Sequence, residues 1–115
     1  MKNRYRTLLL AILFTAATGQ AQDKKAATQD PKPAPVEIKI DNFSFTPPTI
    51  TIPAGTTVRW TNRDDIPHTV VSDDQKFESK ALDTDDQYSY TFNQQGTYGY
   101  FCSIHPKMTG KVVVQ

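Results

Sequence analysis

Apolar and polar side chains alternate along the chain from Val36 onward, which is the pattern of β-strands that bury one face. Turns that contain proline or glycine interrupt the alternation at 47–48, 53–55 and 94–96. Between these turns we expect short strands near residues 36–40, 43–45, 50–52, 56–62, 69–72, 88–92, 97–101 and 111–114.

This arrangement predicts an all-β fold, an antiparallel Greek-key β-sandwich of seven to eight strands. No segment has a convincing helical period, and only 75–82 has room for a single helical turn. Several aromatic residues fall at strand positions. We expect them to fill the core of the sandwich, with an electron path as the alternative: Phe43, Phe45, Trp60, Tyr98 and Phe101.

The first 35 residues differ from the rest and divide into two parts. Residues 1–21 resemble a secretory signal peptide, with a basic start, an apolar run over 8–17 and small residues before position 22. That run is shorter than the about 20 apolar residues that a membrane span requires. An uncleaved anchor remains the alternative. Residues 22–35 hold three prolines and no large apolar side chain, so we expect a flexible linker before a domain at 36–115.

Charge excludes one class of partner. Removal of the signal leaves 10 Lys and Arg against 12 Asp and Glu, so the remaining chain is slightly acidic. It lacks the basic surface of a nucleic-acid-binding protein. We expect the acidic residues to lie in solvated loops. After removal of the signal peptide we expect a monomer without a membrane span. We expect its location to be the periplasm or the outside of the cell.

One group of residues carries metal-binding chemistry. Cys102 is the single cysteine of the chain and cannot form an internal disulfide. It begins a C-x-x-H-x-x-M segment that ends at Met108, between an aromatic strand and the last strand. Such a hairpin end can direct three side chains to one point. His68 precedes another strand and can approach from a neighbouring loop.

Taken singly, these residues are more often structural than functional. Together, a thiolate, two imidazoles and a thioether are the set that forms a trigonal copper site with a long axial sulfur. The soft sulfur ligands suit Cu(I), and the imidazoles suit both oxidation states. Zinc is the alternative metal, but structural zinc sites rarely use methionine. We therefore expect one type 1 copper at His68, Cys102, His105 and Met108.

The residues from Val36 to Gln115 resemble the cupredoxins, the blue copper proteins. The likeness rests on the segments TTVRWTN at 56–62, PHTV at 67–70 and GTYGYFC at 96–102, which runs into the C-x-x-H-P-x-M loop. The spacing within that loop is most similar to the amicyanins, since plastocyanins and pseudoazurins place more residues between the second histidine and the methionine. The resemblance implies that the same four residues ligate copper.

One residue departs from the family pattern. Many cupredoxins have asparagine directly after the first ligand histidine, where it helps to join the two ligand loops. Here that residue is Thr69, whose hydroxyl is expected to supply part of the same support.

The resemblance implies an exported electron carrier rather than an enzyme. Copper enzymes of this fold need further histidine ligands, and the chain has two histidines in all. A copper-binding or delivery protein is the alternative. The expected partners are redox proteins, with a quinoprotein dehydrogenase and a c-type cytochrome or oxidase as candidates. Apolar residues beside the ligands form either a docking patch or ordinary loop packing: Ile66, Pro67, Ile104 and Pro106.

Overall fold

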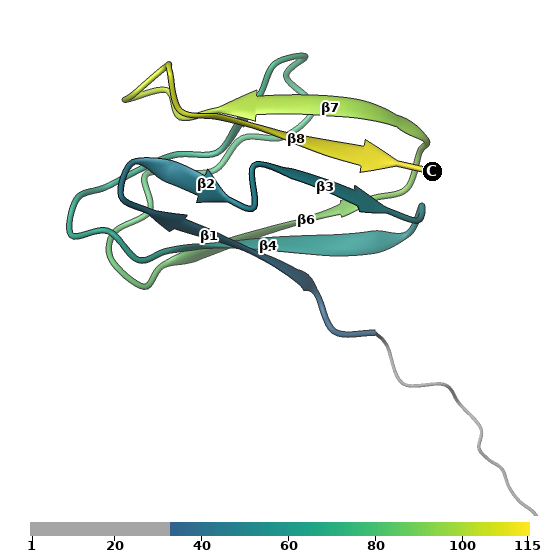
Figure 1. The fold of residues 1–115 in the computed structure, drawn as a ribbon, viewed down its shortest axis with the longest axis horizontal. Helices are drawn as coiled ribbons and strands as arrows, with labels where there is room; N and C mark the ends of the chain where they lie inside the picture. Colours follow the sequence, from purple (N-terminus) through teal and green to yellow (C-terminus); the bar gives the residue numbers. More distant parts are fainter. Residues whose placement is uncertain (1–32) are drawn as a thin grey trace, which may run out of the picture. The chain divides into compact units, whose positions relative to one another are not determined.

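The computed structural model describes residues 33–115 (Figure 1). The predicted signal peptide and the predicted linker up to residue 32 lie outside the described residues. The described part contains eight strands and no helix. They are β1 (Val36–Asp41), β2 (Ser44–Thr46), β3 (Thr49–Ile52), β4 (Thr56–Asn62), β5 (Val71–Ser72), β6 (Gln87–Phe92), β7 (Gly96–Phe101) and β8 (Thr109–Val114).

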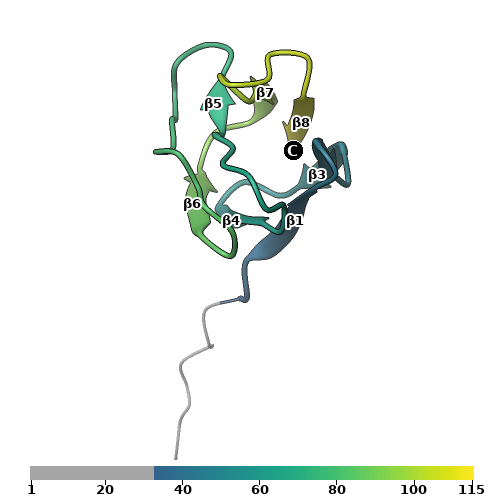
Figure 2. The ribbon, with the colours of Figure 1, turned by 90° about the vertical axis from the view of Figure 1, so that its left-hand side faces the viewer.

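The strands form two four-stranded sheets that pack face to face, as the view in Figure 2 shows. One sheet has the order β2-β1-β4-β6 and the other the order β3-β8-β7-β5. The predicted β-sandwich is confirmed. Its sheets are mixed, because β1 runs parallel to β4 and β3 runs parallel to β8, whereas the other pairs are antiparallel.

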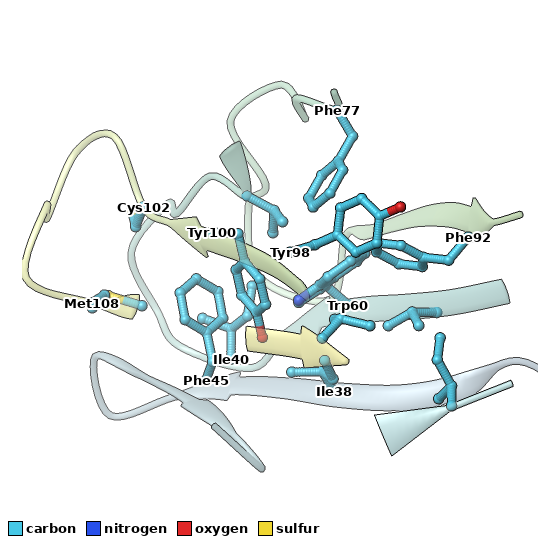
Figure 3. Close-up of a cluster of buried hydrophobic side chains, with 14 of the residues drawn as sticks. Ile38, Ile40, Phe45, Trp60, Phe77, Phe92, Tyr98, Tyr100, Cys102 and Met108 are labelled. Atoms are coloured by element: carbon cyan, nitrogen blue, oxygen red, sulfur yellow. The ribbon is translucent and has the colours of Figure 1, made fainter. Parts of the chain in front are cut away.

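Side chains of alternate strand residues fill the space between the sheets. Ile38 and Ile40 of β1 are fully buried, as the alternation predicted. Trp60 lies at the centre, where its ring contacts the ring of Tyr100 edge-on with the centroids 5.3 Å apart. Figure 3 shows this core extending to Cys102 and Met108 at one end of the sandwich. Two of the predicted metal ligands, Cys102 and Met108, are therefore an extension of the hydrophobic core.

Phe43 is an exception to the predicted core. It lies in the turn between β1 and β2, and 52% of its surface is exposed. Asn42 and Phe43 both have positive φ, 52° and 56°, so the chain reverses here and the alternation of β1 does not continue. Positive φ is uncommon for a bulky residue, and tertiary contacts must hold it. Phe45, Trp60 and Tyr98 are buried as expected, and Phe101 is half-buried.

The segment 75–82 has no helical turn, and it begins in a bend at Gln75, which has a positive φ of 64°. Two isolated bridges, between Glu78 and Val71 and between Leu82 and His68, hold it along the chain that carries His68. Within residues 33–115 no helix is long and apolar enough to cross a membrane.

Candidate metal centre

The two histidines converge on Cys102 from two different loops. The Nδ1 atoms of His68 and His105 each lie 3.7 Å from the Cys102 sulfur. The three donor atoms all lie within 4.8 Å of one another. His68 and Cys102 are fully buried, and His105 is partly exposed. Residues 34 positions apart in sequence thus present a thiol and two imidazole nitrogens to one point.

The loop between β7 and β8 is closed on itself by backbone hydrogen bonds. The Cys102 N–H donates to the Met108 carbonyl at 3.1 Å, and the Met108 N–H donates to the His105 carbonyl at 2.8 Å. The His105 N–H donates to the Cys102 carbonyl at 3.1 Å. These bonds fix the spacing of three predicted ligands. The Met108 side chain is buried at the same end of the core (Figure 3).

Thr69 joins this loop to the loop that carries His68. Its hydroxyl accepts a hydrogen bond from the Ser103 N–H at 2.7 Å and contacts the Ser103 hydroxyl at 2.8 Å. Its own backbone N–H donates to the Cys102 sulfur at 3.3 Å. The threonine therefore performs the joining role expected for this position.

The hydrogen bonds around Cys102 favour its thiolate. Burial alone raises the pKa of the thiol, but hydrogen bonds to the sulfur, of which the bond from the Thr69 N–H is the strongest, outweigh it and lower the pKa to about 6. A thiolate is the form that binds metal. Cys102 therefore presents the metal-binding form at neutral pH.

Asn62 and Asp64 organise the loop after β4, and the sequence analysis did not identify either. The buried Asn62 amide donates to the carbonyls of Ile66 and Leu82 at 2.9 and 2.7 Å. Its carbonyl accepts from the Asp64 N–H at 2.9 Å. The Asp64 carboxylate lies 2.7 Å from His68 Nε2. The only sequence signal is the adjacent acidic pair Asp64-Asp65, and the sequence analysis expects all acidic residues to lie in solvated loops.

Several hydrogen bonds stabilise the charge of Asp64. Burial would raise the pKa of its carboxyl, but the N–H groups of Phe43 and Asn42 and the ring of His68 outweigh that effect and hold the pKa below its usual value. Asp64 is therefore a carboxylate at neutral pH.

An apolar hollow lies over the exposed side of this cluster. It has a volume of about 510 Å³ and is lined by Phe43, Ile104, His105, Pro106, Lys107 and Met108. Phe43 and Ile104 are the large hydrophobic residues that the described part exposes. The Phe43 ring meets the rings of His105 and His68 edge-on, with centroids 5.1 and 5.6 Å apart.

The donor set fits a single copper ion. Three ligands around one ion, at bonds of about 2.0–2.3 Å, lie roughly 3.5–3.7 Å apart. The separation between the Cys102 sulfur and each Nδ1 is 3.7 Å. A thiolate, two imidazoles and a buried thioether form the ligand set of type 1 copper rather than of structural zinc.

Comparison with known proteins agrees with this geometry. The family model for the cupredoxin-like domain matches residues 6–114. The chain is 34% identical to amicyanin from Paracoccus versutus over 92% of this chain and 90% of that protein. The structure is similar to a purple cupredoxin from Nitrosopumilus maritimus, with a TM-score of 0.67, 37% identity, and coverage of 70% of this chain and 99% of that one.

A copper-containing nitrite reductase from Thermus scotoductus is also similar in structure. The TM-score is 0.71 at 33% identity, and the match covers 76% of this chain but 24% of that chain. The similarity therefore concerns one domain of a much longer enzyme.

Proposed function

This chain belongs to the cupredoxin-like family, and we propose that it carries single electrons on one type 1 copper held by His68, Cys102, His105 and Met108. Electron transfer is the activity of its amicyanin and plastocyanin relatives. The observation that supports the ligand assignment most directly is the convergence of His68, Cys102 and His105 within 4.8 Å. When bound, copper supplies the one-electron couple between Cu(II) and Cu(I).

The residues around the site suit this role. Backbone hydrogen bonds within the Cys102–Met108 loop hold the ligands in place without the metal. A ligand set that suits both oxidation states, on a loop held in this way, needs little rearrangement when an electron arrives or leaves. The buried Cys102 sulfur is kept from solvent, which also protects the thiolate from oxidation.

We assign the apolar hollow as the place where redox partners dock. His105 lines it, so a partner that covers Phe43 and Ile104 approaches an edge of a proposed ligand. Docking of this kind excludes water and shortens the distance over which the electron passes between the partner and the proposed copper site. Of the apolar residues named from sequence, Ile104 and Pro106 line the hollow, and Phe43 is added to them. A quinoprotein dehydrogenase as donor and a c-type cytochrome or oxidase as acceptor remain candidate partners.

The remaining assignments concern location and activity. We propose that residues 1–21 direct export to the periplasm or beyond and are removed, that 22–35 form a linker, and that the domain at 36–115 is a monomer. The chain has two histidines, and both belong to the proposed type 1 site. No histidine is left to ligate the second copper that an enzyme of this fold would need, which supports an electron carrier without enzymatic activity.

Titration of the metal-free protein with Cu(II) tests the function. We expect one copper per chain, an intense visible absorption from thiolate-to-copper charge transfer, and its reversible loss on one-electron reduction. The substitution Cys102→Ala should abolish the absorption. A copper-loaded protein without visible colour would exclude a type 1 site.

Substitution of Met108 tests the fourth ligand. Met108→Gln should retain copper but lower the reduction potential, because an oxygen ligand favours Cu(II) over Cu(I). A tenfold change in the relative affinity for the two states corresponds to about 59 mV for one electron, and we expect a decrease of at least that size. Equal potentials in the variant and the original protein would remove Met108 from the site.

A further inference from the structure

Asp64 accepts hydrogen bonds from three donors in two separate parts of the chain. Its Oδ2 atom lies 2.7 Å from Nε2 of the fully buried His68 and accepts from the Phe43 N–H at 3.0 Å. Its Oδ1 atom accepts from the Asn42 N–H at 2.6 Å. The side chain is 11% exposed. A nearly buried carboxylate in a loop is costly unless it is hydrogen-bonded in this way.

The contact with His68 determines which ring nitrogen carries the proton. A carboxylate oxygen only accepts hydrogen bonds, so Nε2 must be the donor. In a neutral imidazole the other nitrogen then has a free lone pair. That nitrogen is Nδ1, which lies 3.7 Å from the Cys102 sulfur. Asp64 thus directs the lone pair of His68 to the side where the other donors lie.

The two backbone contacts hold the turn that carries Phe43. Asn42 and Phe43 have positive φ, a conformation that a phenylalanine seldom adopts without support. Both of their N–H groups donate to Asp64. The Phe43 ring in turn meets the rings of His68 and His105 edge-on. One carboxylate therefore positions a proposed ligand and also the aromatic residue that covers it.

We propose that Asp64 is a positioning residue of the metal centre, which fixes the Nε2–H tautomer of His68 and holds the Asn42–Phe43 turn over the two histidines. The proposal rests on the proposed ligand role of His68. Carboxylates that orient a ligand histidine in this way typically contribute about 10- to 100-fold to metal affinity. Their negative charge also stabilises the more highly charged state of the bound metal.

The neighbouring Asp65 provides a matched control. It has the same charge, it is exposed, and no hydrogen bond of its side chain is recorded within residues 33–115. The backbone of Asp64 is held independently of its side chain, since its N–H donates to Asn62 and its carbonyl accepts from Thr84. Asp64→Ala therefore removes the carboxylate from a loop that keeps its backbone contacts, and Asp64→Asn preserves the volume should the alanine variant fold poorly.

The first measurement uses the metal-free protein, at mildly alkaline pH where free histidine is neutral. Nitrogen-15 NMR should show His68 as the Nε2–H tautomer in the original protein and in Asp65→Ala, with a slowly exchanging ring proton. In Asp64→Ala that proton should exchange rapidly and the Nδ1–H tautomer should become populated. A His68 that is Nδ1–H in the original protein, or that is unchanged in Asp64→Ala, would overturn the proposal.

The second measurement uses the copper-loaded protein. Asp64→Ala or Asp64→Asn should weaken Cu(II) binding by about 10- to 100-fold and raise the reduction potential, whereas the matching Asp65 variants should change both far less. If the Asp64 and Asp65 variants changed the Cu(II) affinity and the reduction potential equally, Asp64 would act only through its charge, and the proposal would be overturned. If even the original protein fails to bind copper, the proposed function fails, and the tautomer measurement still decides the role of Asp64.

Discussion

At the scale of single residues, the site depends on side chains that do not bind metal as well as on those that do. Thr69 contacts Cys102 and Ser103 across the two ligand loops, and Asn62 binds the carbonyls of Ile66 and Leu82 beneath them. Each of these side chains supplies a hydrogen-bond partner to backbone groups of the loops. The ligand geometry is therefore a property of the polar network around it.

Replacement of Thr69 by valine should weaken the contact between the loop that carries His68 and the Cys102–Met108 loop. The variant keeps the shape of the side chain but leaves the Ser103 N–H without its acceptor, which costs about 1–3 kcal/mol when the group is buried. Because this site is only partly buried, we expect a loss near 1 kcal/mol in the free energy of unfolding of the metal-free protein, measured with denaturant. Ser103→Ala retains the bond between the N–H and Thr69 and should lose less. A larger loss in Ser103→Ala would contradict this role for the threonine hydroxyl.

Tyr100 should make the protein sensitive to alkaline pH. Burial raises the pKa of its hydroxyl to about 12, above the ordinary value of 10.0. The unfolded chain therefore releases this proton more readily than the folded protein. The resulting contribution to stability is complete below about pH 10 and declines as the pH rises toward 12. A spectroscopic titration should show one late phenolate step that is missing in Tyr100→Phe, and a variant that keeps this step would assign it to another tyrosine.

The convergence of the proposed metal ligands was the easiest feature of the site to predict from sequence, because three of them lie within one short loop. Asp64 could not be recognised, since its partners Asn42 and Phe43 lie more than 20 positions away and only the fold brings them to it. The exposure of Phe43 was missed for a related reason. Phe43 fits the alternation of apolar residues expected of a strand. Its backbone instead has positive φ and reverses direction there, which the alternation does not reveal.

At the scale of strands, the alternation of side chains predicted most elements but could not determine their partners. The buried face of β1 follows the sequence pattern, and that of β4 follows it as far as Trp60. The parallel pairing of β1 with β4 and of β3 with β8 joins segments that are distant in sequence, and no local pattern encodes it. The segment 75–82 forms no helical turn because Glu78 and Leu82 pair with Val71 and His68, a tertiary effect that local sequence does not reveal.

The pairing of β7 with β8 requires a glycine at one position. Gly110 lies opposite Tyr100, and a Cβ at this position would overlap the tyrosine ring, which is 1% exposed and has no room to move. We expect Gly110→Ala to destabilise the protein by about 1–3 kcal/mol through overpacking, measured by thermal or denaturant unfolding.

Gly99 on the same pair of strands is the control. A Cβ there would meet the side chain of Asp73, which is exposed and able to rotate away. Gly99→Ala should therefore cost much less than Gly110→Ala. Similar losses in the two variants would mean that backbone conformation, and not the Tyr100 ring, determines the requirement for glycine.

At the scale of the whole molecule, the strands and the proposed metal centre of the described residues, 33–115, lie from Val36 onward. A domain of this size buries only about 60% of the surface that its unfolded chain exposes, so its stability is modest. Copper that binds the native state should add to that stability by mass action. The strands and the proposed ligands lie in one small sandwich. Bound copper is therefore expected to stabilise the whole domain against unfolding.

A protein that comprises residues 36–115 should fold and bind copper as the full chain does. Val36 already pairs with Val58, so the shortened chain keeps the whole of β1. We expect the copper-loaded forms of both proteins to have the same visible spectrum. In calorimetry, both should unfold in one cooperative transition whose midpoint temperature rises when Cu(II) is added. Loss of copper binding on shortening would assign a structural role to residues before Val36.

The position of β8 between β3 and β7 has a consequence for the order of events during folding. β8 follows every other strand in the sequence, yet it is the strand that connects β3 to the rest of its sheet. Until β8 has been synthesised, β3 has no neighbour in that sheet, and the loop from Cys102 to Met108 has no second strand to close it. Folding dominated by such distant pairings is slow, typically milliseconds to seconds. The proposed metal centre therefore forms late in folding. A metal ion that is present earlier meets ligand side chains that the fold does not yet hold together.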